Sequence, residues 1–183
     1  MINDKKLLLV DINYFKLIGE KFLESAELLS KQSNFQDHIY SFNILISQAV
    51  EILGKSLIAI KILAGSDASK EEILKNEINK KLKLLKHRLD KILKELPEIK
   101  KQLNIVKVEF FINQFLKEYY FEIINIKNRK SLVIIKDLES ARYSSLAFHK
   151  NVSVINNSND VLQFVNKYKE EVNRLYEKIK QKI

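Results

Sequence analysis

Cysteine and tryptophan are absent from this sequence, and its 183 residues include only three glycines and one proline. The lack of cysteine excludes a disulfide framework, a thiolate metal site and a cysteine nucleophile. An all-β sandwich or barrel needs a turn about every 8–12 residues, and so few turn-forming residues cannot supply them. Gly19, Gly54 and Gly65 also lie too far apart to form the Gly-x-Gly of a phosphate-binding loop.

Long hydrophobic runs are also missing. The run Leu7–Val10 is broken by Asp11 and is too short for the core of a secretory signal. The longest candidate for a spanning helix, residues 44–64, contains charged side chains, whereas a membrane span needs about 18 uncharged apolar residues. The sequence therefore predicts a cytoplasmic protein without a membrane partner.

Hydrophobic residues make up 46% of the chain, and they recur at steps of three and four, the spacing of one buried helix face. Gly65 stands just past the end of the second such segment, where a glycine is expected. Ser69-x-x-Glu72 opens the third with the pattern of a capping box, and Pro97 ends it because proline disfavours helix in the residue before it. The spacing predicts helices over residues 8–29, 35–60, 69–96, about 103–126, about 132–149 and 161–179.

Mostly short connections between these helices favour antiparallel neighbours. The predicted fold is therefore all-α, an up-and-down antiparallel bundle of about five to six helices. Residues 1–150 are expected to form the bundle, and residues 151–183 a C-terminal helix that docks on it or pairs with a second copy. One alternative stays open, because Tyr119–Ile126 also has β-prone character and can pair with Ser131–Ile135 as a hairpin.

The histidines offer no metal site of the usual helical kind. A di-iron bundle needs Glu-x-x-His on two helices, but phenylalanine or leucine stands three residues before each of His38, His87 and His149. We therefore expect neither a metal nor another cofactor.

The net charge of +9 is unevenly placed. Residues 70–107 hold 12 of the basic side chains and 6 of the acidic ones, and such a basic helical face can neutralise phosphates. Most of the basic residues are lysines, which lack the planar fork that reads phosphate or guanine in a bidentate manner. The pattern argues against sequence-specific reading of DNA and leaves two alternatives open, which are loose attraction to RNA or phosphate and a solvated lysine-rich surface.

One arginine–histidine pair is a candidate reaction centre. Arg142 and His149 lie seven residues apart, so on a helix both would point the same way, at the rim of the apolar face. A histidine there can exchange protons with a ribose hydroxyl, while an arginine holds the phosphate. The alternative is that both are ordinary boundary residues at the edge of the core.

Three short patches carry a resemblance to a known family. They are Gln48–Leu57, with Ala49-x-Glu51-x-x-x-Lys55, then His87–Leu93, and Ala141-Arg142-Tyr143. Together with the helix around Phe22–Leu29, they resemble the HEPN family, the helical nucleotide-binding bundles of higher eukaryotes and prokaryotes, over about residues 20–150.

The resemblance implies a bundle that binds nucleotide or RNA, and a metal-independent endoribonuclease in the family's catalytic branch. That branch carries Arg-x(4–6)-His in a cleft shared by a homodimer, and Arg142 and His149 match the outer limit of this spacing. By the same resemblance, Tyr143 would position the ribose, and Lys55, His87 and Arg88 would line the approach.

Tyr143 departs from the polar residue that is common after the arginine in that branch. The departure favours the short members, often non-catalytic, that work with nucleotide-transferase-like partners or in toxin–antitoxin pairs, and it leaves open whether the chain is an enzyme. The alternative function is a non-enzymatic helical interaction or oligomerisation protein with a protein partner or a second copy.

Overall fold

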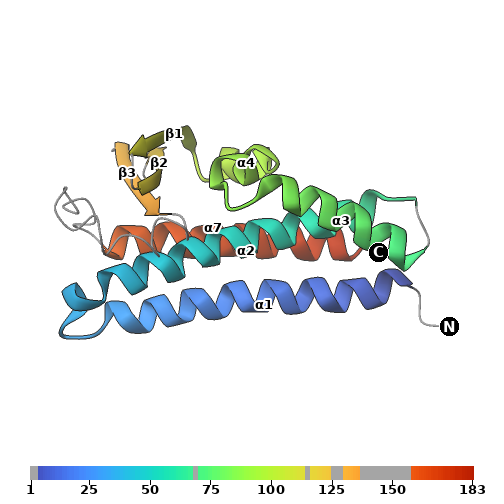
Figure 1. Cartoon of the computed structure of the whole chain (residues 1–183), viewed down its shortest axis with the longest axis horizontal. Coiled ribbons are helices and arrows are strands. Elements are labelled where there is room, and N and C mark those ends of the chain that lie inside the picture. Colours follow the sequence, from blue (N-terminus) through green and yellow to red (C-terminus); the bar gives the residue numbers. More distant parts are fainter. Residues whose placement is uncertain (1–3, 68–69, 114–115, 125–129, 137–157) are drawn as a thin grey trace.

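Three long helices form the body of the molecule. The computed structural model describes residues 4–67, 70–113, 116–124, 130–136 and 158–183. Helices α1 (Asp4–Ser30) and α2 (Ile39–Gly65) are antiparallel and joined through a short 3-10 turn, η1 (Phe35–His38), and α7 (Ser158–Lys180) runs along α2 (Figure 1). The predicted helical bundle is confirmed for this part of the chain, as are the expected helices at 8–29 and 161–179. The expected helix at 35–60 is confirmed from Ile39 onward, because residues 35–38 form the 3-10 turn.

The core lies where these helices meet. Apolar side chains spaced at three and four face inward on each helix, which is why the periodicity located them correctly. The largest fully buried side chains are Leu23, Phe42, Ile46, Leu53, Leu57, Ile60, Leu63, Leu74, Tyr168 and Tyr176. Because two of these come from α7, that helix is part of the core.

The predicted third helix is interrupted. Helix α3 (Glu71–Leu85) ends before Lys86, whose φ is 49°, and two short helices follow, α4 (Leu89–Lys94) and α5 (Pro97–Gln102). The prediction of a single helix over residues 69–96 is therefore wrong. The buried side chains Leu85, Leu89, Ile92 and Leu96 continue the helical spacing across the break, so the apolar pattern does not reveal it.

The two punctuation signals of this segment act differently from the prediction. Pro97 begins α5 at its first position instead of only ending a helix, which proline allows because the first turn leaves its N–H groups unbonded. Lys70, not Ser69, precedes the first turn of α3, and no side chain of that residue caps the helix. The Glu71 N–H donates instead to Asp4 Oδ2 at 3.3 Å, so α1 supplies the cap from 67 residues away.

Residues that were expected to form the fourth helix form strands. β1 (Ile105–Asn113), β2 (Leu116–Ile124) and β3 (Lys130–Lys136) make an antiparallel sheet in the order β1-β2-β3. Tyr119 is opposite Ile135, and Ile123 is opposite Ser131, so the alternative hairpin is the correct prediction. The aromatic and β-branched residues of this segment are common in pleated strands, and pairing among the three strands selects the sheet over a helix. The sheet therefore adds to the helical bundle, and β3 packs beside α2 and α7.

The predicted fifth helix, about 132–149, is wrong at its start, because residues 130–136 belong to β3. Its remainder lies outside the described residues. So do Arg142, Tyr143 and His149.

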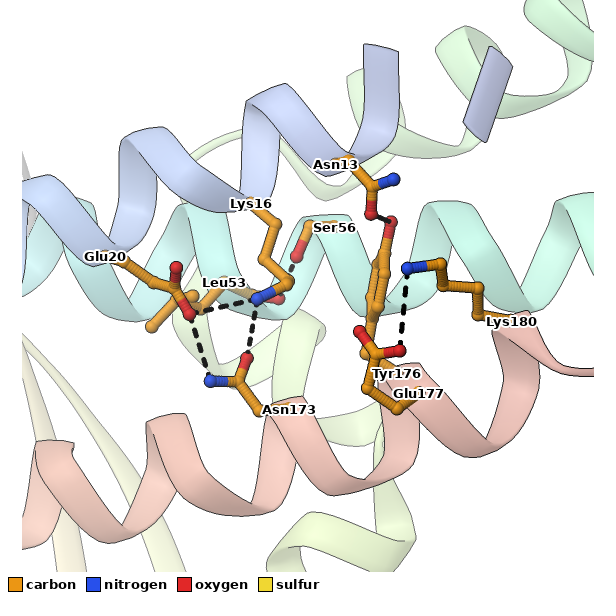
Figure 2. Close-up of polar contacts among 9 residues, drawn as sticks. All are labelled: Asn13, Lys16, Glu20, Leu53, Ser56, Asn173, Tyr176, Glu177 and Lys180. Atoms are coloured by element: carbon orange, nitrogen blue, oxygen red, sulfur yellow. Dashed lines mark hydrogen bonds and ion pairs between the residues drawn. The ribbon is translucent and has the colours of Figure 1, made fainter. Parts of the chain in front are cut away.

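Polar side chains connect α1 to α7 along one side of the core (Figure 2). The Lys16 Nζ donates to Glu20 Oε1 at 2.9 Å and to Asn173 Oδ1 at 2.8 Å, and the Asn173 amide donates to Glu20 at 3.0 Å. One turn away, the Tyr176 hydroxyl donates to Asn13 Oδ1 at 2.8 Å. These bonds satisfy polar groups at the core edge and therefore set how α7 sits on α1.

We expect the Glu20 carboxylate to stabilise the fold at neutral pH and not in acid. Burial raises its pKa, but the hydrogen bonds from Lys16 and Asn173 outweigh burial and hold the pKa below its usual 4.5. A carboxylate whose pKa is lower in the folded state stabilises the fold above its unfolded pKa, and that contribution disappears as the pH falls through the folded pKa.

Urea unfolding of wild type and Glu20→Gln between pH 7 and about pH 3 measures this effect. The stability difference between the two proteins should shrink steadily below the usual pKa of 4.5. Glu24→Gln, which removes an exposed pair with Lys21, should show little difference at any pH. A Glu20→Gln difference that is constant across the range would contradict the assignment.

A candidate anion-binding site

The sequence-predicted binding residues lie at two neighbouring places. Lys55 is on α2, and His87 and Arg88 occupy the turn between α3 and α4. Arg142, Tyr143 and His149, the remaining predicted site residues, lie outside the described residues.

A buried carboxylate brings Lys55 and His87 together. Glu51 lies one turn before Lys55 on α2, with 6% of its surface exposed. Its Oε1 accepts a hydrogen bond from Lys55 Nζ at 2.6 Å, and both of its oxygens lie 3.1 Å from His87 Nδ1. A buried charge requires such partners, so Glu51 orients both side chains. The sequence analysis quoted Glu51 only as part of a motif and missed this positioning role.

Arg88 is held in a different arrangement. Its guanidinium donates to both Asp90 oxygens, at 3.0 Å and 2.8 Å. Burial raises the pKa of the Asp90 carboxyl, but the hydrogen bonds and the charge of Arg88 lower it by more. The net pKa is therefore below its usual value. Arg88 does not line the hollow described next, and the structure therefore separates it from Lys55 and His87.

An open hollow of about 550 Å³ lies over Lys55 and His87. We call it the basic hollow, and it is lined by Phe15, Lys55, Asn79, Leu82, Lys83, Lys86 and His87. Lys83 and Lys86 are exposed, and within the described ranges neither forms an ion pair. The Glu51 carboxylate beside Lys55 offsets one positive charge. The three lysines therefore still give this hollow an excess of positive charge before His87 is counted.

A second, more apolar hollow of about 290 Å³ adjoins the first. We call it the apolar hollow, and it is lined by Leu8, Asp11, Ile12, Phe15, Ala59, Lys75, Ile78, Asn79 and Leu82. Phe15, Asn79 and Leu82 belong to both hollows. The two therefore form one groove between α1 and α3, with α2 at its floor, which is apolar at one end and basic at the other.

A third hollow, of about 520 Å³, is lined by residues of α2 and α3 together with Glu95, which follows α4. Its charges are largely neutralised, because Lys61 pairs with Glu98 at 2.6 Å and Lys81 pairs with Glu95 at 2.8 Å. It therefore attracts anions less than the basic hollow does.

Two observations concern the wider chemistry of the chain. In the part of the chain that the structure describes, no three metal-ligating side chains gather at one place. Over the same residues, no helix has a stretch long and apolar enough to cross a bilayer.

Comparison with known proteins does not assign a family, because no family model, curated protein or solved structure matches this chain.

Proposed function

We propose that this protein binds the phosphate groups of RNA or nucleotides in the basic hollow. The observation that carries the proposal is the convergence of Lys55, Lys83, Lys86 and His87 on one concave surface from two separate helices and a turn. Lysine heads bind phosphate as point charges and do not read bases. The expected binding is therefore strong at low salt, weak at high salt and independent of sequence.

Removing Lys83 and Lys86 together should weaken RNA binding. Both side chains are exposed, so alanine at these positions leaves the core intact. Fluorescence anisotropy with a labelled oligouridylate, at salt concentrations from about 50 to 200 mM, should show about 10-fold weaker binding and a log–log salt slope reduced by about 1.4.

Lys31→Ala/Lys167→Ala is the matched control. It also removes two exposed lysines, one just after α1 and one on α7, and neither lines the basic hollow. Equal loss of binding in both double variants would contradict the site and leave only a general effect of net charge.

RNA cleavage at Arg142 and His149 belongs to the same proposal and is supported by their spacing and by the HEPN resemblance. Mixed RNA incubated with the protein in EDTA, with Arg142→Ala and His149→Ala in parallel, tests it. Cleavage that both substitutions abolish, while oligouridylate binding persists, is the expected result. An intact RNA pool with wild-type protein would overturn the cleavage and leave the binding proposal standing.

A second candidate function, self-association, rests on an apolar stripe along α1. Leu7, Val10, Tyr14 and Leu17 are 44–67% exposed and follow the three–four spacing of a coiled-coil seam. This stripe lies opposite the face of α1 that carries the buried Leu8, Ile12 and Leu23. We propose that it pairs with the same stripe of a second copy in an antiparallel dimer, with Leu7 facing Leu17 and Val10 facing Tyr14.

Charge favours the antiparallel orientation. The next seam positions along α1 are Lys21 and Glu24, which are exposed and bonded to each other at 2.7 Å. In a parallel pair each would face its own copy, and like charges on the seam destabilise pairing. In the antiparallel pair Lys21 and Glu24 lie at or past the first residue of the partner helix and face no seam residue of it. The paired part of the seam therefore contains apolar residues only.

Val10→Glu is expected to convert the dimer to a monomer without unfolding it. The Val10 side chain is 63% exposed, so the substitution disturbs the contact with the second copy and not the core of the monomer. Sedimentation velocity measures the change, and Leu28→Glu, equally exposed on the same helix but outside the paired segment, is the control. A wild-type protein that sediments as a monomer at all concentrations would contradict this function.

A further inference from the structure

The groove has two chemically different ends, and a single ligand that fits both would also have two. Leu8, Ile12, Ala59 and Ile78, which line the apolar hollow, are at most 7% exposed, so they form a preformed apolar wall. The basic hollow next to it carries Lys55, Lys83 and Lys86. Ligand sites commonly combine a mostly apolar cavity with a few placed polar groups.

Phe15, Asn79 and Leu82 stand at the junction, since they line both hollows. Phe15 comes from α1, and Asn79 and Leu82 come from successive turns of α3. The Asn79 amide forms no hydrogen bond within the residues that the structure describes. An asparagine amide has both donors and an acceptor, and it can therefore match the edge of a planar heterocycle placed in the apolar hollow.

We propose that the groove binds an adenine nucleotide, with the base in the apolar hollow and the phosphates in the basic hollow. This inference rests on the proposed phosphate binding and extends it to the base. Phe15 supplies an aromatic face for the base, and aromatic stacking accepts any base. Selection of adenine comes from Asn79, whose amide pairs with the N6 and N7 edge of adenine.

The Asp11 carboxylate supports the same choice. It lines the apolar hollow from α1, whereas Asn79 lines it from α3, and carboxylates accept hydrogen bonds from exocyclic amino groups. Adenine has such an amino group, whereas uracil has a carbonyl oxygen in its place and would face the carboxylate unfavourably. The nucleotide can be free or an unpaired residue of an RNA strand, since both present the same base and phosphate.

Titration calorimetry with ATP, UTP and inorganic tripolyphosphate separates the two ends of the groove. Wild-type protein should bind ATP about 10-fold more tightly than UTP or tripolyphosphate. Asn79→Ala should reduce ATP binding to the level of UTP while leaving tripolyphosphate binding unchanged. Asn76→Ala, an exposed asparagine on the same helix that lines neither hollow, should leave both affinities as in wild type.

The outcomes distinguish this inference from the function on which it rests. Equal binding of ATP, UTP and tripolyphosphate, unaffected by Asn79→Ala, would overturn the base site and retain the phosphate site. No binding of any of the three would overturn both. An oligoadenylate that displaces ATP at a lower concentration than an oligouridylate of the same length would identify an unpaired adenosine of RNA as a second source of the same ligand.

Discussion

Val172→Asp is expected to lower the free energy of unfolding by about 4 kcal/mol or more, because a buried carboxylate without a partner is among the most destabilising changes known. Val172 is on the inner face of α7, and its exposed fraction is 0%. For a chain of this length the loss corresponds to a melting temperature about 10 °C lower. Thermal unfolding followed by far-UV circular dichroism measures it.

Gln163→Asp on the same helix is the matched control. Gln163 is exposed, and it lies near the start of α7, where a negative charge interacts favourably with the helix dipole. It should therefore melt close to wild type. A Val172→Asp protein that melts like this control would show that α7 is not part of the core.

The second large effect is expected at Gly54. A Cβ atom added there would lie 2.5 Å from Ile92 Cγ2 and 2.5 Å from Tyr168 Oη, so α2, α4 and α7 meet too closely for any side chain. Overpacking of this kind costs about 1–3 kcal/mol, and it exceeds the gain of up to about 1 kcal/mol that alanine brings to a helix interior. Gly54→Ala should therefore destabilise the protein in urea unfolding.

Gly65→Ala provides the opposite expectation at the end of the same helix. Nothing lies within 4 Å of an added Cβ at Gly65, so the substitution should be neutral or slightly stabilising. Equal destabilisation by the two variants would mean that backbone freedom, not close packing, explains the glycine at position 54.

A double variant separates the two contacts of Gly54. The Tyr168 hydroxyl donates to the Val50 carbonyl at 3.2 Å, and its complete burial raises the pKa of Tyr168 far above the usual value. Tyr168→Phe removes the oxygen that an alanine at position 54 would meet. In that background Gly54→Ala should cost less than in wild type, by on the order of 1 kcal/mol.

The long helices could be predicted from the sequence because apolar residues at steps of three and four mark the face of a helix that is buried. Leu8 and Ala26 of α1, Leu53 of α2, and Val165 and Val172 of α7 all belong to the predicted apolar stripes and are buried as the pattern requires. The uneven distribution of charge likewise located the lysine-rich segment that supplies Lys83 and Lys86 to the basic hollow. Burial and charge are properties of single positions, so one sequence is enough to reveal them.

Tertiary contacts decided the rest. The break at Lys86 and the cap of α3 by Asp4 leave no local signal, because the apolar steps continue across the break and the capping residue lies in another helix. Between residues 105 and 136, β-branched and aromatic residues fit either a buried helix or a strand, and pairing among the three strands selects the sheet.

The groove shows the same division. The sequence by itself determined that this chain is a lysine-rich, mostly helical protein without thiol chemistry. Lys55 and His87 were named as candidate binding residues by the HEPN resemblance. Only the tertiary structure showed that both side chains bond to Glu51 and that Phe15 and Asn79 line the same hollow. The physical reason is that periodicity states which side of a helix is buried but not which neighbour covers it, and a binding site is made by neighbours.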